Sequence, residues 1–317
     1  MQPSRQLSGT AFALRDPWRW PDFAALVRSG QAQGYSGVFL PEIAGRDAFA
    51  ALTALAGETS TLQLGTGIVP MNARTPQLTA MAAATAHERS GGRVIVGLGT
   101  GPAVPGALDR LRSIVLALRA VFRGEAASVD GREIRLSLPL ESLPQIWVSA
   151  LGPKAVALAG EIADGVLLNW CPPQRVETVR SQLAVGATRA GRDPATVTVA
   201  AYIRASLGQD PAAAMIALQD AAGEYAGYPA YARQFDEAGL GREAGEAAAA
   251  HAAGRPLDVP ERLVHAVALT GDQARARARR QDYLDAGLDV PVIYPVAAGG
   301  DPLGSVRATL AALAPTR

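Results

Sequence analysis

Residues 62–101 read LQLGTGIVPMNARTPQLTAMAAATAHERSGGRVIVGLGTG. The stretch begins with a short apolar run, interrupted by glycines, that predicts a strand, and residues 93–98 predict a second, fully buried strand. Between them, Thr75 followed by Pro76 is typical of a helix N-cap and first helical position, and Ser90-Gly91-Gly92 predicts the end of that helix. A strand, a crossover helix and a strand within about forty residues form a βαβ unit, which predicts a parallel sheet.

The rest of the chain continues this alternation of strands and helices. Strands are expected at 8–14, 35–40, from 62, at 93–98, 145–148, 165–168, 197–203 and 290–294. Helices are expected at 20–34, 47–58, 75–89, 108–122, 152–163, 176–190, 273–286 and 305–313, with a small hairpin excursion at 123–138. Residues 211–269 show no clear strand and much alanine, which predicts a helical insertion or lid. The pattern predicts an α/β fold, a single (β/α)₈ TIM-barrel domain over residues 1–317.

The composition narrows the classes of partner. The formal net charge is +1 and no basic stripe occurs, so we expect no nucleic-acid partner. No run of about eighteen apolar residues and no signal peptide is present, so we expect no membrane association. The single cysteine, Cys171, excludes an internal disulfide and a cysteine-cluster metal site, and it suits the cytoplasm.

Reactive groups of such a barrel are expected at the ends of its strands. The predicted strand ends of this sequence lack the residues typical of hydrolases. The three histidines lie in predicted helices, no GxSxG motif occurs, no spacing suggests a metal, and the glycines do not form a dinucleotide fingerprint. Glycine-rich strand ends with little catalytic machinery favour a cofactor that supplies its own chemistry. Gly152-Pro153-Lys154, with Ser149, is the best candidate for a phosphate site at a helix N-terminus; the alternative is an ordinary helix start.

Three segments of the sequence, in order, resemble the luciferase-like monooxygenase superfamily, and specifically its branch that uses the deazaflavin coenzyme F420. They are GVFLPE at 37–42, the stretch at 62–101, and QIWVSALGPKAVALAGEIADGVLLN at 145–169. The likeness covers most of residues 34–169, and residues 271–295 are similar to the last helix and strand of the family. The resemblance implies a TIM barrel, a small-molecule substrate and a homodimer.

The resemblance also implies where the cofactor binds. A non-prolyl cis peptide bond at Gly67–Ile68, following Thr66, would support the centre of the ring from behind, and Gly99, Thr100 and Gly101 would line the cleft. The ribityl phosphate end would be held by backbone and hydroxyl groups of Ser149, Leu151, Gly152, Pro153 and Lys154.

Two departures from the family pattern limit the substrate. The sugar-phosphate dehydrogenases of this branch have a histidine where Glu42 stands and an acid where Pro102 follows the GTG sequence. The catalytic pair of that subgroup is therefore missing, and a sugar phosphate is a poor candidate for the substrate.

A deazaflavin passes a hydride from ring carbon C5, so the protein has to align the acceptor and stabilise charge or move one proton. Glu42 is our candidate for that proton or for a polar contact near the ring; the alternative is an ion pair at the barrel rim. Further candidates for the substrate pocket are Asn72, Asn169, Trp170, Cys171 and Tyr202, although an aromatic residue at a strand end is as often packed at the rim.

Three functions remain open on sequence alone. The first is hydride transfer between F420 and a small organic substrate. The second is an FMN-dependent monooxygenase fed by a separate reductase, which the lack of an arginine at residues 99–101 to pair with an FMN phosphate disfavours. The third is a barrel that binds a flavin without turning it over.

Overall fold

The computed structural model describes residues 6–15, 17–101, 104–208 and 210–315. Pro102, where the family acid is absent, lies outside the described residues. The chain forms two compact units. Unit 1 consists of Met1–Ser8, Ala13–Leu167 and Gln182–Thr198, and unit 2 consists of Gly9–Phe12, Leu168–Ser181 and Val199–Arg317.

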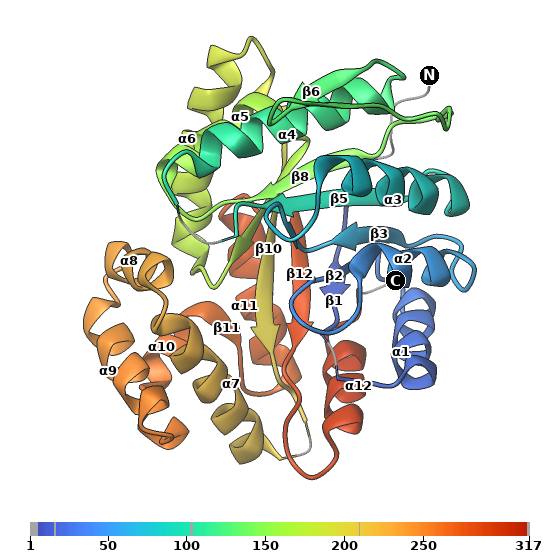
Figure 1. Ribbon diagram of the computed structural model, residues 1–317. Helices are drawn as coiled ribbons and strands as arrows, with labels where there is room; N and C mark the ends of the chain where they lie inside the picture. Colours follow the sequence, from blue (N-terminus) through green and yellow to red (C-terminus); the bar gives the residue numbers. More distant parts are fainter. Residues whose placement is uncertain (1–5, 16, 102–103, 209, 316–317) are drawn as a thin grey trace. The chain divides into compact units, whose positions relative to one another are not determined.

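Unit 1 contains parallel strands that alternate with helices, as the βαβ pattern predicts (Figure 1). Its strands are β2 (Gly37–Leu40), β3 (Gln63–Thr66), β4 (Val69–Pro70), β5 (Val94–Gly99), β8 (Gln145–Ser149) and most of β9 (Gly165–Asn169). Its helices are α1 (Trp20–Ala32), α2 (Ala48–Ala56), α3 (Pro76–Arg89), α4 (Ala107–Phe122), α5 (Pro153–Ile162), the second half of α6 (Pro173–Arg189) and the 3₁₀ turn η1 (Pro194–Thr196). The expected hairpin is the antiparallel pair β6 (Ala127–Val129) and β7 (Arg132–Ile134).

Unit 2 contains the remaining strands and the late helices. Its strands are most of β1 (Ala11–Ala13), most of β10 (Thr198–Ala205), β11 (Ala268–Leu269) and β12 (Val290–Pro295). Its helices are α7 (Pro211–Ala226), α8 (Pro229–Glu237), α9 (Gly241–Ala252), η2 (Pro256–Asp258), α10 (Glu261–Val267), α11 (Gln273–Asp285) and α12 (Pro302–Ala312).

The strand order confirms the predicted barrel. The main sheet runs β11-β10-β12-β1-β2-β3-β5-β8-β9, and β9 also pairs with β10, which closes it. Leaving aside the short strands β4 and β11, this is the eight-stranded parallel barrel with surrounding helices. The register places Leu64 of β3 opposite Val94 of β5, and Val96 opposite Ile146 of β8.

Local signals in the sequence set the helix boundaries. The Thr75 hydroxyl accepts a hydrogen bond from the Leu78 N–H at 3.2 Å, and α3 runs from Pro76 to Arg89 as predicted. The carboxylate of Asp47 caps α2 in the same way, accepting from the Ala50 N–H at 2.9 Å. These caps satisfy N–H groups that the first helical turn leaves without partners, so the chain enters each helix at a defined residue.

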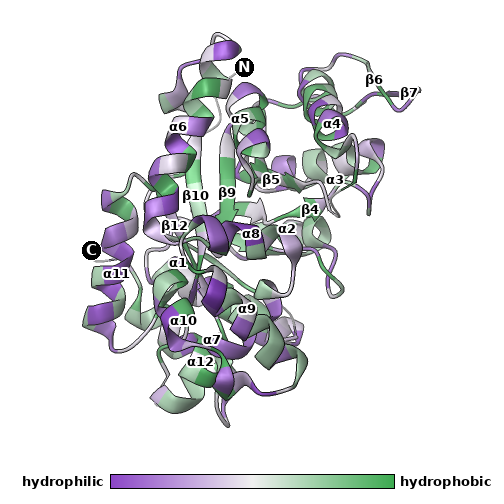
Figure 2. Cartoon of the chain, turned by 90° about the vertical axis from the view of Figure 1, so that its left-hand side faces the viewer, coloured by the Kyte–Doolittle hydropathy of each residue, from purple (hydrophilic) through white to green (hydrophobic). Residues whose placement is uncertain are grey.

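Burial follows the layers of the fold. Every residue of β5 is buried, as expected for a parallel strand covered on both faces. In unit 2, β10 is likewise buried along its whole length and is drawn mainly in hydrophobic colours, whereas α11 carries many hydrophilic residues (Figure 2). The hydrophobic effect therefore places the strands inside and the charged helix faces outside.

The late helical segment packs through small side chains. A Cβ atom added to Gly223 of α7 would lie 2.8 Å from the Cβ of His251 and 3.1 Å from the carbonyl oxygen of Ala247, both in α9. Alanine and glycine here let α7 and α9 approach closely. The segment also ends in the short strand β11, which the expectation of helices alone missed. Whether the 317 residues act as one domain remains a prediction.

Candidate cofactor and substrate sites

A bulge separates β3 from β4 in unit 1. The peptide bond Gly67–Ile68 is cis, which confirms the feature implied by the resemblance. The Gly67 N–H donates to the Leu40 carbonyl at 2.8 Å, and the Ile68 carbonyl accepts from the Glu42 N–H at 3.2 Å. Both sides of the bulge are thus tied to the end of β2 and the loop that follows it.

Thr66 clamps the bulge to β5. Its hydroxyl donates to the Gly97 carbonyl at 2.8 Å and accepts from the Gly97 N–H at 2.8 Å. The approach is so close that a Cβ atom on Gly97 would lie 2.0 Å from the Thr66 carbonyl oxygen. The glycine is therefore required because backbone occupies the space that a side chain would need.

The Ile68 side chain lies against the end of β5. A Cβ atom on Gly99 would lie 2.5 Å from Cδ1 of Ile68 and 2.7 Å from Oγ of Ser149. The structure thus brings together three predicted cofactor residues from β3–β4, β5 and β8. Gly101, which has a φ of 69°, lies close to Asn72. A Cβ atom added to this glycine would lie 2.4 Å from Oδ1 of Asn72.

The N-terminus of α5 is open. Gly152 is its N-cap residue, and no side chain of the described residues caps the helix there. Among the residues that the structure describes, a Cβ atom added to Gly152 would meet no atom within 4 Å, and Gly152, Pro153 and Lys154 are all exposed. The free N–H groups and the positive end of the helix dipole suit an anionic group. Of the remaining predicted cofactor residues, Thr100 and Leu151 are half-buried, and the Thr100 hydroxyl donates to the Gly101 carbonyl at 3.1 Å.

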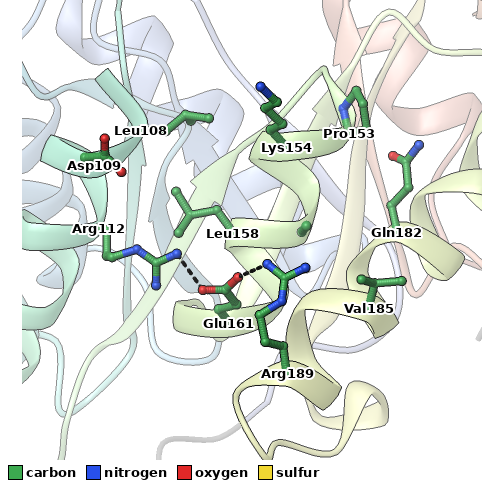
Figure 3. A pocket seen from close by; sticks show the side chains of 11 residues that line it. Leu108, Asp109, Arg112, Pro153, Lys154, Leu158, Glu161, Gln182, Val185 and Arg189 are labelled. Atoms are coloured by element: carbon green, nitrogen blue, oxygen red, sulfur yellow. Dashed lines mark hydrogen bonds and ion pairs between the residues drawn. The ribbon is translucent and has the colours of Figure 1, made fainter. Parts of the chain in front are cut away.

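A pocket of about 400 Å³ adjoins this helix, between α4, α5 and α6 (Figure 3). Pro153 and Lys154 lie at one end of it. Toward the other end, the Glu161 carboxylate accepts from Arg112 at 2.5 Å and from Arg189 at 3.2 Å. The acid is therefore already paired, which leaves the ammonium group of Lys154 as the cation next to the open N-terminus of α5.

Glu42 occupies the rim in the way our alternative described. Its Oε2 accepts from the Ala48 N–H at 2.9 Å and pairs with Arg74 at 3.3 Å. Arg74 also pairs with Asp47. Partial burial acts to raise the pKa of Asp47, but hydrogen bonds from the Ala50 N–H and from Arg74 lower it overall. Glu42 thus helps to organise the start of α2, and its catalytic role stays a prediction.

A second group of predicted residues lies in unit 2, around Arg204 at the carboxyl end of β10. Arg204 is 4% exposed. Its guanidinium carbon lies 4.0 Å from the ring centroid of Tyr294 and 4.7 Å from that of Trp170, with the rings of Tyr225 and Tyr202 at 5.3 Å and 5.6 Å. Each such cation–π contact is worth about 0.5–2 kcal/mol, the higher values applying where water is excluded.

A hydrogen-bonded chain leads away from this cation. Arg204 donates to Oδ1 of Asn169, and Nδ2 of Asn169 donates to the Tyr231 hydroxyl at 2.7 Å. The arginine can only donate, so it fixes which amide atom of Asn169 faces it. Burial, with the neighbouring Tyr225, raises the pKa of Tyr231 to about 12, and burial also raises the pKa of Tyr202. Both phenols therefore stay protonated near neutral pH.

Trp170 and Cys171 follow directly after β9. Trp170 is 1% exposed and has a φ of 51°, an uncommon conformation for a bulky residue. The Gln234 amide of α8 holds this turn, donating to the carbonyls of Asn169 at 3.0 Å and Trp170 at 2.7 Å. Cys171 is buried, and this burial raises the pKa of its thiol to about 12, which favours the neutral form.

The structure therefore groups most predicted residues into two sets, one in each unit. Sequence reasoning missed the importance of Arg204, Tyr231 and Gln234. Arg204 left a signal, because a charged residue interrupts the apolar run TVAAYIRA. Tyr231 and Gln234 left none, since both come from the Ala-rich helical segment.

Two classes of site find no support in the described ranges. No group of three or more His, Cys, Asp or Glu residues there is arranged to hold a metal ion. Among the helices of the same ranges, none combines the length and the apolar character needed to span a membrane.

The family model of luciferase-like monooxygenases matches residues 5–290. The 5,10-methylenetetrahydromethanopterin reductase of Methanolobus tindarius is 34% identical over 226 residues, which are 67% of this chain and 68% of that protein. A Mycobacterium tuberculosis protein named as a coenzyme F420-dependent oxidoreductase is 34% identical over 196 residues, 53% of this chain and 56% of that protein.

Among solved structures, the F420-dependent tetrahydromethanopterin reductase of Methanopyrus kandleri superposes with a TM-score of 0.79 at 20% identity, covering 98% of both chains. This likeness shows the fold, and the family match extends over most of the sequence. The chain belongs to the luciferase-like monooxygenase family.

Proposed function

We propose that this protein is a coenzyme F420-dependent oxidoreductase that transfers a hydride between F420 and a small organic substrate. The observation that carries the proposal is the bulge at Gly67–Ile68, with Ile68 set against Gly99 and Ser149. The relatives named above add support, since two of their names include F420. The FMN-dependent alternative has weaker support, because no relative named above has FMN in its name.

The residues present fit such a cofactor. The open space at Gly152 and the uncapped N-terminus of α5 suit an anionic end group, with the exposed Lys154 nearby. The backbone of the bulge is held on both sides by hydrogen bonds, so it presents a fixed surface. When bound, F420 supplies the hydride chemistry itself. The contribution of the chain is to hold the cofactor, to exclude water and to position the acceptor.

Equilibrium titration distinguishes the cofactors. We expect F420 fluorescence to change on addition of the protein and to saturate at micromolar or lower concentration, while FMN binds at least tenfold more weakly. Preferential binding of FMN would contradict the proposal. Tight binding of F420, with no substrate oxidising its reduced form faster than the free cofactor does, would favour the barrel that only binds.

Glu42 is our candidate for moving the proton. Its Oε2 is engaged with Ala48 and Arg74, and its side chain is 15% exposed. Glu42→Gln keeps an oxygen for the Ala48 N–H, so we expect the fold to persist while hydride transfer slows by about 100-fold. Glu42→Asp, which retains the acid, serves as the control. Equal rates for the glutamine variant and wild type would restrict Glu42 to its structural role.

Two further expectations accompany the resemblance. We infer a homodimer, so light scattering should give about twice the 32.8 kDa of the chain. We also infer a cytoplasmic location, which fractionation of the source cells checks. A monomer, or recovery of the protein in another compartment, would overturn the respective inference.

A further inference from the structure

Arg204 is a buried cation that pairs with no carboxylate in the part of the chain that the structure describes. Its contacts are four aromatic rings and the neutral amide of Asn169. Buried charges in proteins are usually paired, because removing an ion from water without an opposite charge is costly. Aromatic faces offset only part of that cost, so the cation is poised for an anion that the described residues do not supply.

The same cluster holds further hydrogen-bond donors. Nη1 of Arg204 donates to Asn169, and a guanidinium has four further N–H donors. The Trp170 indole N–H is buried without a hydrogen-bond partner among the described residues. The Tyr231 oxygen accepts from Asn169, which leaves its own proton available to donate. Arg204 and Tyr231 hydrogen-bond to the two ends of the Asn169 amide, so both can offer donors to one acceptor-rich group, and Trp170 adds a donor in the same cluster.

We propose that Arg204 binds the carboxylate of a small, flat, apolar organic acid, which is the substrate class of this enzyme. That this acid is a substrate rests on the proposed function. That the site binds an acid rests only on the residues of unit 2. The planar guanidinium matches a carboxylate through two parallel hydrogen bonds. Asn169 holds the guanidinium in place, and the rings of Trp170, Tyr202 and Tyr294 suit a flat apolar body.

Access to Arg204 depends on side chains rather than on backbone. The two tyrosines that approach from the helical segment, Tyr225 and Tyr231, are half-buried, and Tyr228 between them is 49% exposed. The rings of these three tyrosines contact one another. A ligand would therefore reach the guanidinium from this side only if these rings move, which the binding experiment tests.

Binding of simple probes tests the proposal without any cofactor. Benzoate has both a negative charge and a flat aromatic ring. Benzamide has the ring without the charge, and inorganic phosphate has the charge without the ring. We expect benzoate to bind by calorimetry and to raise the Tm, with benzamide at least tenfold weaker and phosphate without effect. Equal binding of benzoate and benzamide, preference for phosphate, or no binding of benzoate would each overturn the proposal.

Substitutions test whether benzoate binds at Arg204. Arg204→Met should weaken benzoate at least tenfold. Asn169→Asp should do the same while keeping the arginine, because an internal carboxylate would then occupy the cation. Arg279→Met is the matched control: Arg279 also lies over a tyrosine ring, at 5.9 Å from Tyr283, but already pairs with Asp282. If Arg204→Met fails to fold, Asn169→Asp still decides, and unchanged benzoate affinity in it would overturn the proposal.

Titration with F420 separates this proposal from the preceding one. Wild type that binds benzoate but not F420 supports the carboxylate site and contradicts the cofactor assignment. Wild type that binds F420 but not benzoate supports the cofactor assignment and contradicts the carboxylate site. Arg204→Met should retain F420 affinity within twofold, and loss of F420 affinity would mean that Arg204 serves the cofactor and would overturn the substrate assignment.

Discussion

The bulge in unit 1 and the arginine cluster in unit 2 differ in the groups that form them: glycines and close backbone at the bulge, and large side chains around the arginine. At the bulge, the backbone of Thr66 occupies the space that a side chain on Gly97 would need, and the side chains of Ile68 and Ser149 lie against Gly99. Around Arg204, large side chains from the turn after β9, from β10, from β12 and from the helical segment enclose one charge. The first arrangement suits a site with one fixed ligand, and the second suits a site whose specificity is set by side chains. Four changes test this contrast.

The largest effect is expected at Gly97. Gly97→Ala places a methyl group 2.0 Å from the Thr66 carbonyl oxygen, and backbone cannot move aside as a flexible side chain can. We expect a loss of about 3 kcal/mol or more in the free energy of unfolding, measured by urea denaturation. Gly152→Ala, with no atom within 4 Å of the new Cβ, is the control and should change stability little. Equal stability of the two variants would refute the backbone contact.

Removing the hydrogen bonds between the Thr66 hydroxyl and Gly97 should reduce the free energy of unfolding somewhat less. Thr66→Val keeps the shape of the side chain but removes the hydroxyl that both donates to and accepts from Gly97. We expect a loss of about 2 kcal/mol, because buried polar groups are left unpaired. Thr66→Ser retains the hydroxyl and should recover most of that loss in the same denaturation experiment. A serine variant as unstable as the valine variant would point to packing instead.

The side-chain cluster should tolerate change better. Tyr231→Phe removes the acceptor of the Asn169 amide but leaves the ring in place. Because Asn169 is half-buried, water can reach its amide in part, and we expect a loss of about 1 kcal/mol. Thermal unfolding measures it, and a loss as large as that of Gly97→Ala would remove the contrast between the two regions.

The smallest effect concerns the rim of unit 1. The pKa of Asp47 is lowered in the folded state, so its contribution to stability is present above the ordinary aspartate pKa and is lost as pH falls through the lowered value. The Asp47 side chain is 44% exposed, so screening keeps the contribution below about 1 kcal/mol. Arg74→Met should reduce this acid-side slope of stability against pH. A slope unchanged by the substitution would exclude the Arg74 contact as its cause.

Sequence reasoning recovered the first region better than the second for a physical reason. Glycines, the Thr75-Pro76 helix start and the buried strands are local signals, so the barrel could be predicted, and α3 almost to the residue. The cis bond came only through the resemblance. Arg204, in contrast, meets Asn169, Tyr225 and Tyr294 only because the fold brings distant elements together. The pairing of Glu42 with Arg74, likewise, depends on side-chain directions that periodicity does not reveal.

The central claim is that exposed backbone at the start of α5 holds the cofactor. Its most direct test is the affinity for F420 of Gly152→Leu, whose new side chain would enter open space, compared with Gly245→Leu at an equally open position on α9. We predict that F420 binds at least tenfold more weakly to the first variant, a difference of about 1.4 kcal/mol, while the second binds like wild type. Equal affinity of all three proteins would contradict the account.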